Sequence, residues 1–168
     1  MSTPSLPFDP VAEATRHWRE HGWGDAAVGM EAVTSLMRAQ AIVQARVDEV
    51  LRPLQLTFAR YELLMLLSFT RSGALPMAKA GARLQVHPAS VTNAASRLEA
   101  AELVRRRPHP EDGRGVLVEI TDAGRELAAK ATARINEVFA APDLSNDRMR
   151  ELIVILRDLR RAAGDFGD

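Results

Sequence analysis

Apolar residues recur three, four or seven positions apart through most of the chain, which is the spacing of helices that bury one side. This spacing predicts a helix from Pro10 to His21 after the N-cap Asp9, and a long helix from Asp25 to Arg52. It also predicts helices over residues 58–70, 77–85 and 88–100, and two more that begin after the caps Thr121 and Ser145. Leu75-Pro76 is expected to form a short extended joint. The fold class is therefore mainly α.

Alternating apolar and polar positions are confined to the middle of the chain. Residues 103–107 and 115–120 alternate, and the segment between them contains Asp112-Gly113, so we predict two strands joined by a long hairpin. Two short helices followed by such a hairpin form a winged helix-turn-helix. We expect an N-terminal tail with dimerisation helices over 1–56, a winged helix-turn-helix over 57–121, and C-terminal dimerisation helices over 122–168.

The second helix of this motif has an unusual outward face. Its apolar residues Val91, Ala95 and Leu98 share one side. The opposite side carries Ser90, Asn93 and Arg97, with Thr92 at its margin. Small hydroxyls, an amide and one guanidinium suit contact with base edges and phosphates better than they suit an ordinary solvated face. We therefore interpret this helix as one that reads double-stranded DNA.

The charge of the whole chain is balanced, with 22 basic and 22 acidic residues among 168. The stretch from Lys79 to Arg114 nevertheless holds seven Lys and Arg against four Asp and Glu, which favours a local basic surface for a polyanion. The absence of cysteine excludes disulfides and thiolate metal sites. No apolar run is long enough for a membrane span, and the first residues do not resemble a secretory signal. We expect a cytoplasmic protein without cofactor or bound metal.

Apolar stripes at both ends of the chain exceed what a small winged helix can bury. One stripe follows the helix over 25–52 and includes Val33, Leu36 and Val43; another follows the last helix and includes Leu156 and Leu159. Stripes of this length need a second surface, and most oligomers are symmetric. We therefore predict a two-fold homodimer whose terminal helices pair.

The residues VTNAASRLE, LVRR and PEDGRGVLVEITDAGREL, in this order and spacing, resemble the MarR family of bacterial transcriptional regulators over about residues 30–163. The resemblance implies that Arg114 on the hairpin enters the minor groove and that Asp112 orients it. The family usually has glycine at the position of Glu102, after the DNA-reading helix. We therefore expect a strained or differently shaped end of that helix here.

The tryptophan-bearing N-terminal helix resembles the UrtR/TamR-like branch of the family, whose members respond to urate or tricarboxylate-type metabolites. The resemblance implies a ligand site formed by Trp18, Glu62 and Arg106, with Trp23 as an alternative to Trp18. Strand alternation places Arg106 on the face opposite its two arginine neighbours. Ala94 stands where a second arginine of the urate pattern would fall, so a citrate- or aconitate-like anion is favoured over a urate-like one.

Two alternatives accompany this interpretation. Glu62 can instead be a helix-margin carboxylate that pairs with Arg38 or Arg60. The sequence His17-Trp18-Arg19-Glu20-His21 matches the H-x-x-E-H zinc pattern, which is the basis for the alternative of a metal-dependent hydrolase. No helix with a third ligand follows this pattern. We expect a protein that is not an enzyme: a repressor released from a pseudo-palindromic operator by a small organic anion, or else a regulator without an effector.

Overall fold

A computed structural model describes residues 6–85, 87–110, 115–140 and 144–167 of the chain. Its internal contacts define two compact units, Met1–Arg46 and Val47–Asp168. Helix α2 (Gly24–Leu51) crosses the boundary between them. Each unit has buried side chains of its own.

The first unit consists of α1 (Pro10–Glu20) and most of α2. The carboxylate of Asp9 accepts a hydrogen bond from the Val11 amide at 2.9 Å, and Pro10 fills a position whose amide would have no helical partner. Thr15 is buried beside Val11 and donates to its carbonyl oxygen at 2.9 Å. Both predicted helices are confirmed, each within two residues of its expected ends.

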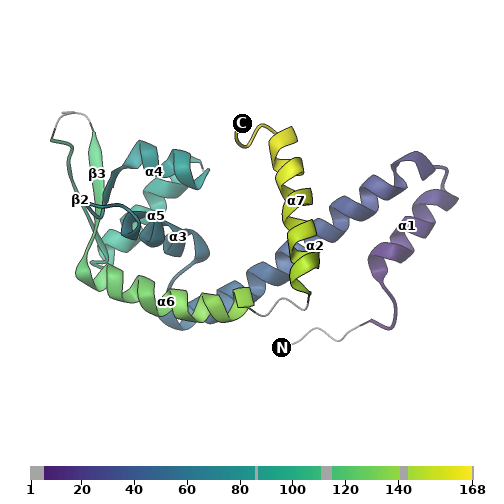
Figure 1. Ribbon diagram of the computed structural model, residues 1–168, viewed down its shortest axis with the longest axis horizontal. Helices are drawn as coiled ribbons and strands as arrows, with labels where there is room; N and C mark the ends of the chain where they lie inside the picture. Colours follow the sequence, from purple (N-terminus) through teal and green to yellow (C-terminus); the bar gives the residue numbers. More distant parts are fainter. Residues whose placement is uncertain (1–5, 86, 111–114, 141–143, 168) are drawn as a thin grey trace. The chain divides into compact units, whose positions relative to one another are not determined.

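The second unit contains the predicted winged helix, in the order α3 (Phe58–Ser68), α4 (Met77–Leu84), α5 (Pro88–Ala100), β2 (Val104–Pro108) and β3 (Val116–Ile120) (Figure 1). Thr57 is the N-cap of α3, as predicted, because its hydroxyl oxygen accepts from the Arg60 amide at 3.4 Å. A short 3-10 helix, Arg52–Leu54, joins α2 to this cap. The helix-turn-helix consists of α4 and α5.

The sheet has a third strand that the sequence did not predict. Residues Ala74–Pro76, expected to be only an extended joint, form β1 and pair antiparallel with β3, which gives the strand order β1-β3-β2. A strand of three residues is too short to show alternation. Pro76 has no backbone N–H to donate. It is tolerated because β1 lies at the edge of the sheet and is hydrogen-bonded to a neighbouring strand on one side only.

Helix α6 (Asp122–Ala140) begins unusually close to the sheet. The hydroxyl oxygen of Thr121 accepts from the Gly124 amide at 3.0 Å and caps the helix, as expected. A Cβ atom at Gly124 would lie 2.1 Å from the carbonyl oxygen of Leu103, so this approach requires glycine. The last helix, α7 (Asn146–Ala162), begins after the cap Ser145.

The main core lies between α3, α5, α6 and the sheet. The predicted inward residues of α5, Val91, Ala95 and Leu98, are all buried, and Ala131 of α6 is buried with them. Phe139, near the end of α6, is 55% exposed, because the apolar spacing of α6 continues beyond the core it packs against.

Large apolar side chains remain exposed on helices α2 and α7 of the single chain. On α2 they are Val28, Val33, Leu36, Met37, Ile42 and Val43. On α7 they are Leu152, Ile153, Val154, Ile155 and Leu159. Consecutive residues of a helix point in directions about 100° apart, so the run from 152 to 155 covers nearly the whole circumference of α7. No helix among the described residues is long and apolar enough to cross a membrane.

Candidate nucleic-acid interface

Three of the predicted DNA-contacting side chains lie together on the exposed side of α5. Ser90, Asn93 and Arg97 line one recess of about 510 Å³. The recess is completed by Ala94 and by the first residues of α3 with its cap: Thr57, Ala59 and Arg60. No carboxylate belongs to the described residues that line it. A concave surface with two guanidiniums, two hydroxyls and an amide provides hydrogen-bond donors for phosphates and base edges.

Arg60 is the member of this surface that the sequence analysis missed. It was considered only as a partner of Glu62, but its Nε donates to the hydroxyl oxygen of Thr57 at 3.2 Å. The sequence contained an indication of this placement. An arginine three residues after an N-cap lies on the same side of the helix as the cap, so Arg60 could have been grouped with Thr57.

Thr92 lies apart from the other three predicted contacts. It lines a different cavity, of about 660 Å³, together with Arg106 of β2 and Lys79 of α4. Its carbonyl oxygen accepts from Arg106 Nη2 at 3.0 Å and from Ser96 Oγ at 2.8 Å. Helix α5 therefore has one polar side with Ser90, Asn93 and Arg97, and another that faces the hairpin.

Arg106 binds the hairpin to α5 through several contacts. Its Nη2 donates to Ser96 Oγ at 2.7 Å, and its backbone amide donates to Glu99 Oε1 at 3.0 Å. Its Nε is buried and makes no hydrogen bond among the described residues. The Glu99 carboxylate, whose Oε2 lies 3.6 Å from this Nε, supplies a compensating negative charge. The predicted placement of Arg106 on the face opposite Arg105 and Arg107 is confirmed, and its partners are Ser96, Glu99 and the Thr92 carbonyl.

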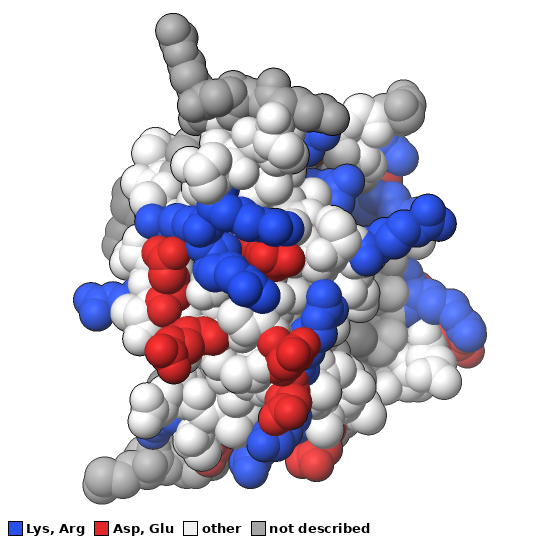
Figure 2. All heavy atoms as spheres, turned by 90° about the vertical axis from the view of Figure 1, so that its left-hand side faces the viewer, with Lys and Arg blue, Asp and Glu red and all other residues white. Residues whose placement is uncertain are grey.

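Arg105 and Arg107 lie on the opposite face of β2 and share one carboxylate. Glu119 Oε2 is 3.2 Å from Arg105 Nε, and Glu119 Oε1 is 3.1 Å from Arg107 Nη2. The basic segment is therefore less positive than its composition indicates. Figure 2 shows this pattern on the side of the molecule that carries the hairpin, where basic side chains gather with acidic ones directly beside them.

The predicted minor-groove pair, Asp112 and Arg114, lies outside the described residues. The segment that contains it is bracketed by a backbone hydrogen bond from the His109 amide to the Gly115 carbonyl, 2.9 Å long. Strands β2 and β3 pair directly below, with Pro108 opposite Val116. The predicted hairpin is confirmed up to this point.

Glu102 adopts the left-handed conformation that glycine usually supplies at this position. Its φ is +59°, and its carbonyl oxygen accepts from the hydroxyl of Thr121 at 2.9 Å. The expected strain at the end of α5 is confirmed, since a residue with a Cβ is disfavoured in this conformation.

The three predicted ligand residues lie in three different surroundings. Trp18 belongs to the first unit, where its ring meets that of Trp23 edge to face with centroids 4.9 Å apart. The two tryptophans are neighbours, although the sequence analysis treated them as alternatives. Within the second unit, Glu62 and Arg106 line separate cavities.

The cavity beside Glu62 is apolar and measures about 340 Å³. Its other lining residues are Phe58, Tyr61, Met65, Leu66, Phe69, Leu84 and Phe139. Burial raises the pKa of the Glu62 carboxyl above its usual value. Among the described residues of the second unit, no hydrogen bond or ion pair reaches this carboxylate, so the suggested pairing with Arg60 is not found.

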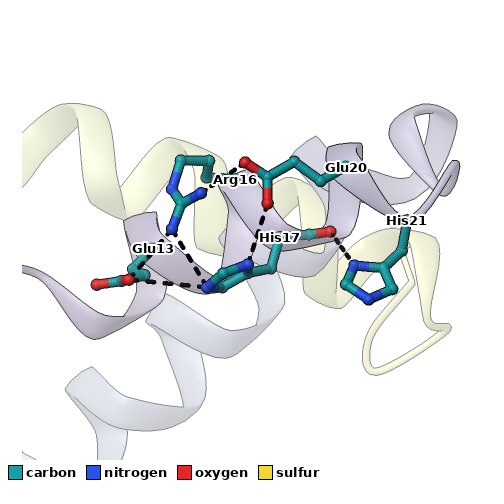
Figure 3. Close-up of polar contacts among 5 residues, drawn as sticks. All are labelled: Glu13, Arg16, His17, Glu20 and His21. Atoms are coloured by element: carbon teal, nitrogen blue, oxygen red, sulfur yellow. Dashed lines mark hydrogen bonds and ion pairs between the residues drawn. The ribbon is translucent and has the colours of Figure 1, made fainter.

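The H-x-x-E-H segment of α1 does not form a convergent metal site. Glu20 is engaged by Arg16 at 2.5 Å and by His17 Nδ1 at 3.2 Å, and Glu13 approaches the same two residues (Figure 3). The His21 ring instead contacts the carbonyl oxygen of His17 at 2.8 Å. In the residues the structure describes, no group of three or more His, Asp and Glu side chains is placed to hold a metal ion. The segment forms a surface ion-pair network.

Comparisons with known proteins agree with this architecture. The MarR family profile matches residues 56–116. The HTH-type transcriptional regulator YhbI of Bacillus subtilis is 34% identical over 117 residues, which cover 70% of this chain and 71% of that protein. Sco5413, a MarR family transcriptional regulator from Streptomyces coelicolor, is 48% identical with a TM-score of 0.75, covering 83% of this chain and 98% of that one.

A third protein shares the fold at lower identity. The structure of BpsR from Bordetella bronchiseptica, described in terms of the regulation of its DNA binding by 6-hydroxynicotinic acid, has a TM-score of 0.69 at 23% identity, covering 77% of this chain and 98% of that one. Together with the geometry of α4, α5 and the hairpin, the closer relatives establish the class. This chain belongs to the MarR family of DNA-binding transcriptional regulators and is not an enzyme.

Proposed function

We propose that the protein is a homodimeric repressor that binds a pseudo-palindromic operator and is released by a small organic anion. The observation that carries the DNA-binding part is the recess in which Ser90, Asn93 and Arg97 of α5 lie beside Arg60. Arginine pairs with guanine and asparagine with adenine in the major groove. The hydroxyls of Ser90 and Thr57 suit neighbouring phosphates.

The hairpin is the second proposed contact with DNA. Arg114 enters the minor groove beside the major-groove site, and Asp112 holds its guanidinium in position. Thr92 lies on the hairpin side of α5, so we assign it to the sugar–phosphate backbone between the two grooves. Arg105 and Arg107 share Glu119 and contribute less to phosphate attraction than their number suggests.

The dimeric assembly is supported by the exposed apolar residues of the long helices. Apolar side chains around nearly the whole circumference of α7, such as Ile153 and Ile155, are typical of a helix that another chain covers. In a two-fold dimer the two α5 helices would occupy successive major grooves about 34–36 Å apart. The operator would then consist of two inverted half-sites whose centres are separated by that distance.

The effector is proposed to be a small organic anion that binds beside Arg106, of the citrate- or aconitate-like class first and the urate-like class second. The cavity at Arg106 also contains Lys79 and His109, and its volume of about 660 Å³ lies within the common range for ligand sites. BpsR provides a precedent for an organic acid that regulates DNA binding on this fold. Membership of the UrtR/TamR-like branch belongs to this proposal.

An anion at this site would compete with α5 for the Arg106 guanidinium. Taking Nη2 away from Ser96 and the Thr92 carbonyl would loosen the hairpin from α5 and lower operator affinity. Glu62 is left out of the anion site, because a carboxylate in an apolar cavity repels an anion. A regulator without an effector is the alternative, and it predicts that no metabolite changes DNA binding.

The experiment begins with selection of the operator from a random duplex library with the full-length protein. Binding of the selected operator is then followed by fluorescence anisotropy at fixed salt, because phosphate contacts make affinity depend on ionic strength. Citrate, aconitate and urate are titrated against the complex. We expect a two-fold symmetric consensus and release by an anion at or below millimolar concentration. An asymmetric consensus would contradict the dimeric proposal, and a complex insensitive to every anion would favour the regulator without an effector.

A further inference from the structure

The cavity beside Glu62 has a chemical character opposite to that of the Arg106 cavity. We propose that it binds a small organic cation with an aromatic or other apolar substituent, such as an arylalkyl ammonium compound. This inference goes beyond the proposed function, since it concerns a second ligand of the opposite charge class. The described lining residues belong to α3 and its C-cap Phe69, to α4 and to α6, all within the second unit.

The charge argument rests on Glu62. It is the single carboxylate among the described lining residues, and no Lys, Arg or His accompanies it there. Among the described lining residues the one further polar group is the phenol of Tyr61, whose oxygen shares a hydrogen bond with Thr132 Oγ1 at 3.1 Å. A half-buried carboxylate that has no partner among the described residues of its own unit gains most from a cation, because pairing offsets the loss of hydration. An anion in the same cavity would face uncompensated repulsion.

The aromatic lining supports a cation that carries apolar groups. Four of the eight lining residues are aromatic, and the Phe58 and Tyr61 rings lie 6.1 Å apart at an interplanar angle of 30°. Phe69 and Phe139 are 79% and 55% exposed, so their rings are accessible to a ligand. The negative faces of such rings attract quaternary and tertiary ammonium groups. Met65, Leu66 and Leu84 provide an apolar surface for the remainder of the ligand.

The volume limits the size of this ligand. About 340 Å³ is near the lower end of the range for small-molecule sites, which suits one aromatic ring joined to a substituted ammonium group. The competing occupant is an apolar segment of a second copy of this chain. Such a segment would leave the Glu62 carboxylate buried against apolar atoms without a counter-charge, which is costly.

The test compares two ligands of the same shape and opposite charge. Benzyltrimethylammonium and phenylmethanesulfonate are titrated into the full-length protein, without DNA, by isothermal titration calorimetry. We expect one cation to bind per chain and the sulfonate to bind at least about tenfold more weakly, consistent with an ion pair reinforced by cation–π contacts. Equal binding of the two ligands, or no binding of the cation up to about 10 mM, a concentration far above an ordinary ligand Kd, would overturn the proposal.

Matched variants locate the site. Glu62→Gln preserves shape and removes the charge, so it should weaken cation binding about tenfold. Phe69→Leu should weaken it less, and Glu126→Gln on the exposed side of α6 should leave it unchanged. Cation binding that survives Glu62→Gln places the ligand elsewhere. If Glu62→Gln alters only the dimer dissociation constant by light scattering, a second copy occupies the cavity and the proposal fails.

A measurement on the unaltered protein gives an independent check. The affinity for benzyltrimethylammonium should fall as the pH is lowered and Glu62 takes up a proton. Because burial raises the pKa of this carboxyl, the fall should begin above the usual pKa range of glutamate. An affinity that does not change with pH would contradict the role of Glu62. Operator binding is not involved, so failure here leaves the proposed repressor function untouched.

Discussion

The guanidinium of Arg106 donates to the hydroxyl of Ser96 at 2.7 Å and thereby joins strand β2 to the middle of α5. The same Nη2 atom reaches the Thr92 carbonyl, and Glu99 accepts from the Arg106 amide. Helix α5 and the hairpin are therefore held together by polar contacts as well as by the apolar core. Any change in these contacts alters how the major-groove and minor-groove elements are placed relative to one another.

The first prediction concerns this junction. Arg106→Gln should weaken operator binding, and Ser96→Ala should weaken it less, because the arginine keeps its contact with the Thr92 carbonyl. In a double-mutant cycle the two changes should couple by about 0.5–1.5 kcal/mol, the ordinary value of one hydrogen bond. Fluorescence anisotropy on the selected operator and on a scrambled duplex measures the effect.

The scrambled duplex separates positioning from general attraction to DNA. Loss of one positive charge lowers binding to both duplexes, whereas misplacement of α5 lowers binding to the operator alone. Arg106→Lys retains the charge without the planar fork and should recover scrambled-duplex binding but only part of the operator binding. Equal losses on both duplexes for every variant would show that Arg106 acts as a phosphate contact.

The second prediction concerns base reading. Arg97→Ala and Asn93→Ala should each cost roughly 1–3 kcal/mol of operator affinity and relax base preference at one position per half-site. Arg60→Ala should weaken binding to all sequences alike and reduce its salt dependence, as loss of a phosphate contact does. Arg134→Ala on the exposed side of α6 is the matched control. An unchanged consensus after selection with Arg97→Ala would exclude this residue from base contact.

Periodicity predicted most of the elements but did not predict all of their pairing. The caps Asp9, Thr57 and Ser145 and the inward residues of α5 follow from rules that act within a few positions of the chain. The third strand was missed because Ala74–Pro76 is defined by its partner β3, which lies 41 or more residues away along the chain (from Pro76 to Leu117). Pairings at such separation leave no local signal.

The candidate sites show the same limit. The alternation of residues along β2 correctly predicted the face on which Arg106 lies. It did not predict that the carboxylate of Glu119 forms ion pairs with both Arg105 and Arg107. A family resemblance grouped Glu62 with Arg106, whereas the fold separates them into cavities of opposite charge. Which side chains share a cavity depends on how helices pack, and a single sequence does not specify this.

The third prediction concerns the assembly. Leu159→Glu introduces a charge on the exposed apolar side of α7 and should convert the dimer into monomers or aggregates, because a buried unpaired charge is costly. Leu156→Glu should behave similarly. Asp147→Asn, a charge change in the first turn of the same helix, where the side chain is 87% exposed, is the control and should leave the dimer intact. Light scattering over a range of protein concentrations measures the outcome; stable dimers for both leucine variants would place the interface elsewhere.

The fourth prediction concerns the end of α5. Glu102 is held at a φ of +59°, where glycine has no steric penalty. Glu102→Gly removes this strain but also adds conformational freedom to the unfolded chain, so we expect a net gain of about 1 kcal/mol or less in unfolding free energy. Glu102→Val should be destabilising, because a β-branched side chain is strongly disfavoured in this region. Urea denaturation of the three proteins tests the order, and a valine variant as stable as the glycine variant would contradict it.

The fifth prediction concerns the dependence of stability on pH at Glu62. Burial raises the pKa of this carboxyl in the folded protein above its value in the unfolded chain, so the folded state holds the proton more tightly. The resulting stabilisation is present at low pH, and it is lost as the pH rises through the folded pKa. Glu62→Gln cannot ionise and should therefore be more stable than the wild type at pH 7–8, with the difference shrinking toward about pH 4.

The effect should be small, because the Glu62 side chain is only half-buried and water screens part of its charge. Thermal unfolding of both proteins from pH 4 to pH 8 gives the difference in Tm as a function of pH. Phe139→Leu is the control, since it changes the same cavity without changing a charge, and its difference from the wild type should not vary with pH. If the Tm difference of Glu62→Gln is flat, or grows toward acid pH, the carboxylate has a counter-charge in solution. The basic group that supplies it would then come from the first unit, from a second copy of the chain or from a bound ligand.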